Sequence, residues 1–462
     1  MTSAAITAER AAPVEQPATL PGAQRAAALL MLAYMLSFMD RQILVLMIEP
    51  LQRDLKINDS QFSLLHGTSF ALFYTIVGLY VGGLIDRHHS VRILDWAVAW
   101  WSLATAVCGL ARGYGQLFAA RMMVGVGEAA LSPGAYSLLS DYYEPRRRTR
   151  AFAIYATGMH LGSGVAFILG GRLIGYLESI PPVTMPLLGT LESWRLTFLV
   201  VGVPGLLLGL VIRWFIREPE RGTMDRAVPG AEAQAAKATS HREFFAFVRA
   251  NRAAYTNHNL GFGLHMMFSY AITSWLPVLL LRTYHWPVTQ VGLVMGIQFL
   301  IFGPLGAFLG GKAARMLRER GDASAEMTLG AASCAMLLLG VVILTLFHGA
   351  GVVLAVAALQ IFFVAFPGSL NAASLQIVAP PRFRGLSGAL FMLVGNLLGL
   401  ALGPLVVGML TDYVFADKKM VGMSLLTMGV VVMPVAIALL LAGRRYFRMA
   451  PAGQAAAQVQ PA

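Results

Sequence analysis

Long apolar runs separated by short polar segments fill the chain from residue 26 to residue 443. Almost every run exceeds 20 residues, the length that an α-helix needs to cross a hydrocarbon layer about 30 Å thick. We place the runs at 26–48, 62–85, 93–111, 117–140, 151–175, 195–216, 253–281, 288–311, 327–347, 352–378, 385–411 and 421–443. The pattern therefore predicts an all-α membrane protein with twelve transmembrane helices.

Small residues repeat between the two halves of this pattern. The span 151–175 contains "TGMHLGSGVAFILGG" and the span 385–411 contains "VGNLLGLALGPLVVG", and three glycines match at a constant offset of 237 residues. The matched glycines are Gly158, Gly162 and Gly171 in the first half, and Gly395, Gly399 and Gly408 in the second. The repeat predicts two parallel six-helix units, an architecture in which two halves rock about a central site.

The repeat also sets the domain boundaries. We predict an N-terminal six-helix bundle over residues 25–216, a cytoplasmic linker over 217–250 and a C-terminal six-helix bundle over 251–443. Residues 1–24 are rich in alanine and proline and lack an apolar core, so we expect a disordered cytoplasmic tail. A second cytoplasmic tail is expected over 444–462.

Three polar residues, Asn58, Asp59 and Ser60, precede the second span. They match the glycosylation sequon Asn-X-Ser, and all three residue types also favour the N-cap of a helix. We interpret them as the cap of the helix that follows.

The chain carries a formal net charge of +12, although only 13% of its residues are charged, 57% are hydrophobic and the mean hydropathy is +0.66. Of the 35 lysine and arginine residues, 25 lie in tails and loops on one side of the predicted bundle and 8 on the other. The positive-inside rule places both termini and the linker in the cytoplasm. The basic excess therefore indicates topology and contact with membrane lipids, not nucleic acid. We expect a multi-pass protein of a bacterial inner membrane.

Several classes of function lack their signatures in the sequence. No glycine-rich P-loop is present, so ATP-driven pumping is not expected. The 217–250 linker is too short for a sensor domain, and His66 and His160 fit packing or cavity roles better than intramembrane catalysis. Cys108 and Cys334 lie in distant spans, so neither a disulfide nor a metal site is expected. We predict a monomeric transporter without a cofactor.

Two adjacent charges, Asp40 and Arg41, interrupt the first apolar span in "MLSFMDRQI". Each ionised residue in the middle of a membrane costs on the order of 2.5–3.5 kcal/mol, so such residues are retained where they are paired or line a cavity. Neighbouring residues on a helix point about 100° apart, so these two cannot neutralise each other well. Away from span ends, the remaining charged residues are Arg121 and Glu128 in the span 117–140.

The depth and direction of these side chains favour an Arg41–Glu128 pair. The first and fourth helices run in opposite directions and side chains lean toward their own N-termini, so these two lean toward each other. Asp40 and Arg121 would complete a four-charge network. One interpretation is a static ion lattice that orients the two helices. The interpretation that we favour is exchange: a substrate anion binds Arg41 and Arg121, and Glu128, with Asp40, takes up protons.

The second half offers aromatic and amide side chains in place of charges. Its spans contain no Asp, Glu, Lys or Arg away from their ends. We expect Tyr270, Trp275, Phe366 and Asn371 to contact the substrate. A charged first half that faces an apolar second half suits an amphiphile with an anionic head.

The segment "GGLIDRHHSVRIL" resembles the signature loop of the major facilitator superfamily, although His88-His89 stands where that family prefers a glycine. The resemblance implies a cytoplasmic gate between the halves. In it Asp86 would face the N-terminal end of the helix 385–411, while Arg87 and Arg92 would pair with carboxylates such as Asp141.

Further segments resemble the spinster branch of that superfamily. They are "FMDRQILVLMIEPLQRDLKINDSQFSLL", "GVGEAALSPGAYSLLSDYYEPRRRTRAFAIY", "SWRLTFLVVGVPGLLLGL" and "REPERG". The resemblance implies a proton-coupled or gradient-driven carrier of lysophospholipids or sphingolipid phosphates. It also assigns Asp40, Arg41, Arg121 and Glu128 to the charged cavity. The same motifs occur in organic-anion symporters, so a carboxylate symporter or a drug exporter is the alternative.

Overall fold

The computed structural model describes residues 19–85, 87–185, 189–222, 224, 240–368 and 370–459. The helices of the first half are α1 (Ala23–Leu46), α2 (Ile48–Leu55), α3 (Asp59–Ser63), the π-helical η1 (Leu64–Thr68), α4 (Ser69–Ile85), α5 (Ser90–Cys108), α6 (Tyr114–Glu128), α7 (Leu131–Tyr142), α8 (Pro145–Ser179) and α9 (Ser193–Phe215). An antiparallel hairpin, β1 (Val183–Met185) and β2 (Gly189–Leu191), lies between α8 and α9 and was not predicted.

The second half has the corresponding helices. They are α11 (His241–Ala250), α12 (Arg252–Arg282), α13 (Val288–Glu319), α14 (Ala325–Leu346), α15 (Ala350–Ala365), the 3-10 turn η2 (Phe366–Gly368), α16 (Leu370–Val378), the 3-10 turn η3 (Pro381–Phe383), α17 (Arg384–Gly395), the π-helical η4 (Asn396–Leu402), α18 (Gly403–Met409), the π-helical η5 (Leu410–Phe415), the 3-10 turn η6 (Lys418–Met420) and α19 (Val421–Val459).

The predicted spans correspond to these helices. Among the described residues, eleven helices are long and apolar enough to cross a membrane. The remaining predicted span, 117–140, consists of α6 and α7 with an interruption at Ala129 and Ala130. Pro133 has no N–H to bond the carbonyl of Ala129 in a continuous helix, which explains the interruption. The twelve-helix arrangement is confirmed, with one helix broken.

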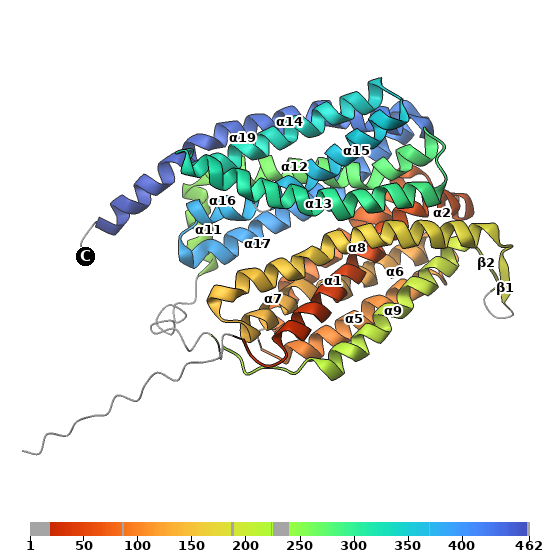
Figure 1. Ribbon diagram of the computed structural model, residues 1–462, viewed down its shortest axis with the longest axis horizontal. Coiled ribbons are helices and arrows are strands. Elements are labelled where there is room, and N and C mark those ends of the chain that lie inside the picture. Colours follow the sequence, from red (N-terminus) through yellow and green to blue (C-terminus); the bar gives the residue numbers. More distant parts are fainter. Residues whose placement is uncertain are drawn as a thin grey trace, which may run out of the picture.

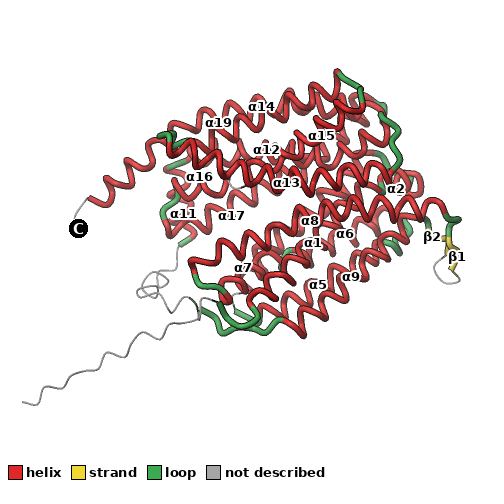
Figure 2. The backbone as a smooth tube through the Cα atoms, in the orientation of Figure 1, coloured by secondary structure: helices red, strands yellow, loops and turns green. Residues whose placement is uncertain are grey.

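The two halves form two packed layers, one from α1 to α9 and the other from α12 to α19 (Figure 1). Between the layers, α8 packs along α13, while α3, η1 and α4 pack along η4 and α18. We call the end where α19 leaves the bundle the terminal end. The opposite end, which carries α2 and the β1–β2 hairpin, is the far end (Figure 2).

The repeated glycines make equivalent contacts in the two halves. Gly158 and Gly162 of α8 lie directly against the α1 backbone at Met31 and Met35, and Gly395 and Gly399 lie against Met266 and Tyr270 of α12. The third glycine of each set crosses to the other half: Gly171 meets Gly292 of α13, and Gly408 meets Asp59 of α3. Small residues permit this close approach of helices. The internal repeat that the sequence predicts is therefore present in the packing.

The predicted end of the first tail needs correction, and the structure adds detail to the linker and the second tail. Residues 19 and 20 do not extend a free tail, because Thr19 bridges to Tyr143 and the Leu20 N–H donates to the Tyr142 carbonyl at 3.0 Å. The segment from residue 444 is helical as the continuation of α19. Within the predicted linker, α11 packs Phe244 against Phe383 of the second half. The rest of the first tail, residues 1–18, lies outside the described residues, as do 223 and 225–239.

The α1–α8 contact gives a test of packing. A Cβ at Gly162 would collide with backbone atoms of Met35, which cannot move aside as a flexible side chain can. Gly162→Ala is expected to lower the free energy of unfolding by about 1–3 kcal/mol. Gly115→Ala in α6 is the matched control, because a Cβ there meets open space and alanine favours the helix. Thermal melting in detergent measures both; equal melting temperatures would contradict the packing argument.

Candidate functional site

An ion pair joins α1 to α6 in the middle of the first half. The Arg41 Nε and Nη2 atoms lie 2.9 and 2.5 Å from Oε2 of Glu128, as predicted from their depth and direction. Ser37, one helical turn before Arg41, donates its hydroxyl to the same oxygen at 2.5 Å. Glu128 is 1% exposed, and its Oε1 has no hydrogen-bond partner among the described residues.

The other two charges of the predicted network are arranged differently. Asp40 accepts a hydrogen bond from the Thr105 hydroxyl of α5 at 2.9 Å, so its direct partner is a neutral side chain. Arg121 is completely buried, and none of its guanidinium nitrogens has a hydrogen-bond partner within the described part of the chain. Electrostatic interaction links Asp40 to both Arg121 and Glu128. The four formal charges cancel, but Arg121 has unused donors.

Aromatic rings surround the Arg41 guanidinium. Its central carbon lies 4.3 Å from the ring centre of Phe70, 4.8 Å from Phe38 and 5.2 Å from Tyr74. Such cation–π contacts stabilise a guanidinium that is shielded from water. The Arg41 side chain nevertheless keeps 11% of its surface exposed. Arg41 is therefore the partner in the ion pair that a solute can reach.

The second half meets this site through Tyr270 and Asn396. Tyr270 interacts electrostatically with Arg41 and Tyr74, and the Asn396 amide donates to the Thr75 hydroxyl at 3.4 Å. Tyr270 is thus placed across from the first-half charges, where the sequence predicted a substrate contact. Whether it binds substrate stays a prediction.

The remaining predicted substrate residues are packed in other ways. Trp275 is 1% exposed, and its indole N–H donates to the Pro404 carbonyl at 3.0 Å. Phe366 packs against Phe362 and Phe363 in its own half. The Asn371 carbonyl accepts a hydrogen bond from the Ser374 hydroxyl at 2.9 Å. In this conformation, Trp275 and Phe366 are parts of the helix packing.

The described members of the predicted gate, Arg87, Arg92 and Asp141, lie at the terminal end. Asp86 is outside the described residues. Asp141 accepts a hydrogen bond from the Gly222 N–H at 3.0 Å, so the segment after α9 reaches this carboxylate. The Arg87 N–H donates to the Leu84 carbonyl, and Arg92 lines a surface groove together with Trp96. The gate that the resemblance implies stays a prediction.

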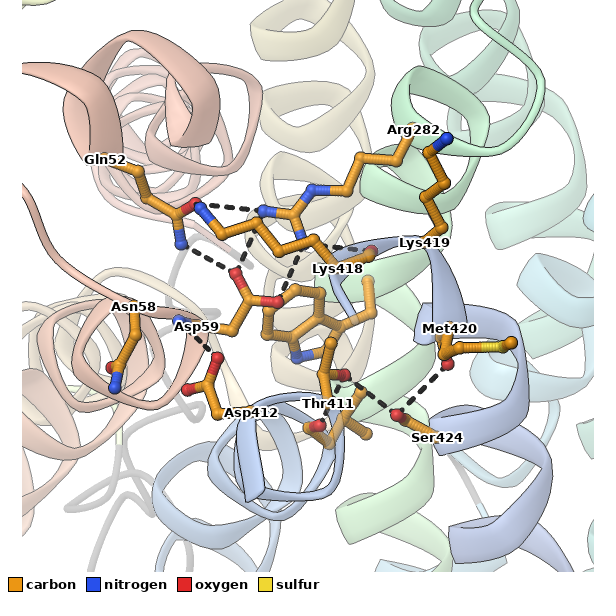
Figure 3. Close-up of polar contacts among 12 residues, drawn as sticks. Gln52, Asn58, Asp59, Arg282, Thr411, Asp412, Lys418, Lys419, Met420 and Ser424 are labelled. Atoms are coloured by element: carbon orange, nitrogen blue, oxygen red, sulfur yellow. Dashed lines mark hydrogen bonds and ion pairs between the residues drawn. The ribbon is translucent and has the colours of Figure 1, made fainter. Parts of the chain in front are cut away.

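A polar cluster closes the far end between the halves (Figure 3). Arg282 at the end of α12 binds both carboxylate oxygens of Asp59 at 2.7 and 2.9 Å, and its Nε lies 2.6 Å from Glu49. Gln52 accepts hydrogen bonds from Arg282 at 3.0 Å and from Lys418 at 2.8 Å. Asp59 is fully buried here. Cations of the second half thus hold carboxylates of the first.

Contacts between the halves can be followed from the far end toward the terminal end. Inter-half hydrogen bonds run from the far end to Thr75 and Asn396. Beyond that level, Met392 lies one turn from Asn396 and is 50% exposed, and an added Cβ at Gly385 or Gly388 would meet no atom within 4 Å. These hydrogen bonds between the halves therefore lie at the far end and in the middle of the interface.

Sequence reasoning missed the far-end cluster and the neutral partners of the charges. Ser37 could have been found from its position, because residues four apart share a helix face. Thr105 and Arg282 had no comparable signal, because serine and threonine occur throughout the apolar spans and Arg282 lies at the end of a span.

Comparison with known proteins agrees with this architecture. The Major Facilitator Superfamily profile matches residues 30–404. An MFS-type efflux pump of Mycolicibacterium smegmatis is 25% identical, over 89% of this chain and 91% of its own length. The sphingosine-1-phosphate transporter SPNS2 of Danio rerio is 24% identical, over 84% and 76%. A D-galactonate transporter of Escherichia coli is 26% identical, over 86% and 92%.

One solved structure extends the comparison to three dimensions. A bacterial homologue of the human lysosomal transporter Spinster, crystallised in an inward-facing and unoccupied conformation, superposes with a TM-score of 0.72. It covers 93% of this chain and 97% of its own, at 23% sequence identity, so the likeness concerns the fold. The chain therefore belongs to the Major Facilitator Superfamily of transporters, and its predicted similarity to the spinster branch is confirmed.

Proposed function

We propose that this chain is a proton-coupled secondary active transporter of an amphiphilic anion, and that the Arg41–Glu128 pair couples proton to substrate. One observation carries the proposal. Oε2 of Glu128 accepts hydrogen bonds from Ser37 and twice from Arg41, while Oε1 has no partner among the described residues. The charge on this buried carboxylate is therefore stabilised mainly by one arginine that remains partly exposed.

Substrate binding would change this balance. An anionic head group that binds Arg41 would take donors away from Glu128, and Arg121 would supply further donors. A carboxylate left without its counter-ion in the membrane interior is costly, so Glu128 would take up a proton. The protein then carries anion and proton together, and release of either favours release of the other. Asp40, held by Thr105, is a second candidate for the proton.

The surroundings of the pair favour a substrate with an apolar part. Arg41 lies among Phe70, Phe38 and Tyr74, and Tyr34 and Tyr136 extend this aromatic wall through their contacts with Tyr155. We propose a lysophospholipid or a sphingolipid phosphate, whose phosphate would bind the arginines while its chain contacts the rings. The similarity to a sphingosine-1-phosphate transporter supports this class.

A second candidate is a small organic anion. The D-galactonate transporter matches over 92% of its own length, and the hydroxyls of Ser37 and Thr105 beside the charges would suit a hydroxylated carboxylate. An exported drug is the third possibility, supported by the similar efflux pump.

We also propose an orientation. The basic loops support an orientation with the terminal end in the cytoplasm, and we propose a bacterial inner membrane as the location. The far-end cluster would then face outward, and this conformation would receive or release substrate on the cytoplasmic side. The site lies within one chain, so a monomer suffices.

Transport by the purified chain tests the proposal. Proteoliposomes would be loaded with radiolabelled lysophosphatidylglycerol, sphingosine-1-phosphate or D-galactonate, with and without a pH gradient, and albumin extraction would report lipid that has crossed the bilayer. We expect the wild type to move a lysolipid or sphingolipid phosphate faster with the gradient. Glu128→Gln should retain movement down a concentration gradient and lose the response to pH.

Two other outcomes of this transport experiment would change the proposal. Movement of galactonate alone would replace the first substrate class by the second. A pH response in Glu128→Gln equal to that of the wild type would contradict the role of Glu128. Liposomes without protein, and liposomes treated with a protonophore, are the controls.

A further inference from the structure

A second contact at the far end differs in kind from the Arg282 cluster. Asp412, in the π-helical turn η5 of the second half, accepts hydrogen bonds from the backbone N–H groups of Asp59 and Ser60 at 3.2 and 2.6 Å. It also accepts the Ser60 hydroxyl at 2.7 Å. Asp59 and Ser60 are the first two residues of the continuous helical segment Asp59–Ile85 of the first half.

This segment already has its own cap. Asn58 accepts the Gln61 N–H at 2.8 Å, and the Gln61 side chain accepts the Asn58 N–H at 3.0 Å, so the predicted N-cap is confirmed as a capping box. The Phe62 N–H donates to the Asn58 carbonyl at 2.9 Å. The N–H groups of Asp59 and Ser60 are the ones left over at the helix start. They are satisfied by a carboxylate from the other half, where the helix dipole also favours a negative charge.

The backbone brings Asp412 close enough for this role. One turn earlier, Gly408 of α18 lies so near the Asp59 carbonyl that no side chain fits between them. Further along the same interface, Gly67 of η1 meets the Leu400 carbonyl of η4 in the same way. Two π-helical turns, η1 and η4, thus face each other where the segments cross, and such turns are common at functional sites.

We propose that Asp412 is a latch that holds the two halves together at the far end, and that its release accompanies opening of the far end. It binds the Asp59 backbone N–H, whereas Arg282 binds the Asp59 carboxylate. The inference rests on the proposed alternating-access transport. Because Asn58 and Gln61 cap the helix from within the first half, Asp412 is not required to start that helix. Its hydrogen bonds therefore contribute to the closed state specifically, since all of them cross between halves.

Distance measurements between spin labels test the latch without any substrate. In a Cys108→Ala/Cys334→Ala background, labels at Ser179→Cys and Gly349→Cys report the far end, and labels at Arg146→Cys and Gly385→Cys report the terminal end. All four positions are exposed. Asp412→Asn should raise the population with a longer far-end distance by roughly tenfold or more, the size expected for hydrogen bonds to a charged group.

Asp417→Asn is the matched control. Asp417 belongs to the loop that follows η5, but its carboxylate accepts the Lys419 N–H within the second half, at 2.8 Å. We expect it to leave both distance distributions unchanged. If the far-end distance distribution of Asp412→Asn equals that of Asp417→Asn, the proposed latch is overturned.

Ser60→Ala provides a second test in case Asp412→Asn does not fold. Ser60→Ala removes the hydroxyl donor and keeps the two backbone donors, so it should produce a smaller shift in the same direction. No shift in a folded Ser60→Ala, with Asp412→Asn unfolded, would overturn the latch as well. These distances do not depend on which substrate is carried or on proton coupling, so the latch and the proposed function can fail independently.

Discussion

Arg41→Ala is expected to reduce transport at least about 100-fold and to lower the free energy of unfolding by about 3–5 kcal/mol. The loss of stability follows because Glu128, which is buried, would keep Ser37 as its one remaining hydrogen-bond donor among the described residues. The loss of transport follows because the exposed cation of the site would be gone. Uptake into proteoliposomes and thermal melting of the purified protein measure the two effects.

A double variant separates the two roles of the pair. Arg41→Ala/Glu128→Gln removes both charges, so most of the lost stability should return, while transport should remain absent. If the pair were only a static ion lattice between α1 and α6, the stabilised double variant would transport normally. That result would contradict the proposed coupling.

Arg147→Ala provides the matched control in the same half. Arg147 lies 3.4 Å from Glu144, but its side chain is 60% exposed and that of Glu144 is 35% exposed, so its removal strands no buried charge. Its removal should cost about 1 kcal/mol or less and leave uptake near the wild-type rate. A loss of uptake as large as that of Arg41→Ala would mean that any missing arginine damages the bundle.

The Arg41–Glu128 pair could be predicted from the sequence because charges are scarce in the spans. Away from the span ends only four charged residues were available, and their depths and directions left one good pairing. The neutral partner Thr105 could not be predicted, because serine and threonine occur throughout the apolar spans. The interruption after Glu128 was also missed, although Pro133 in the same span is a known signal for a break.

The far-end cluster was missed for a physical reason. A charged residue at the end of a span normally reaches water, so Asp59 and Arg282 gave no signal of burial. Asp59 is buried because the second half covers it, and that contact depends on the conformation of the whole chain. The sequence correctly indicated the local structure, since Asn58 does cap the helix, but it could not indicate which half would cover the cap.

The segment after residue 444 was predicted to be a cytoplasmic tail because the apolar pattern ends there. The structure continues α19 past Gly443 to Val459, and the alanines of this segment favour a helix. Arg444 then reaches back to Asp322 and Ser324 near the start of α14, which ties the extension to the bundle.

Arg282→Met is expected to open the far end and to lower the free energy of unfolding by about 3–5 kcal/mol. The guanidinium binds both oxygens of Asp59 and also Glu49 and Gln52, and methionine replaces its volume with no donor. Asp59 would keep a side-chain hydrogen bond from Gln52 at 2.7 Å, which cannot balance a buried charge. The chain can relieve this charge by separating the halves, so water reaches Asp59.

The same far-end and terminal-end spin labels measure this opening, and two variants test its cause. Arg195→Met removes an arginine that binds Asp54 at 2.9 Å within the first half, so it should leave the far-end distance unchanged. Arg282→Met/Asp59→Asn removes the stranded charge, so the halves should close again in part, while the inter-half ion pair remains absent. A far-end distance in Arg282→Met equal to that in Arg195→Met would show that packing of Trp275 and the glycine contacts hold this end without the ions. We therefore expect the far-end distance to be longest in Arg282→Met, intermediate in Arg282→Met/Asp59→Asn and shortest in Arg195→Met. This order follows because the buried Asp59 carboxylate is stranded in the first of these variants alone.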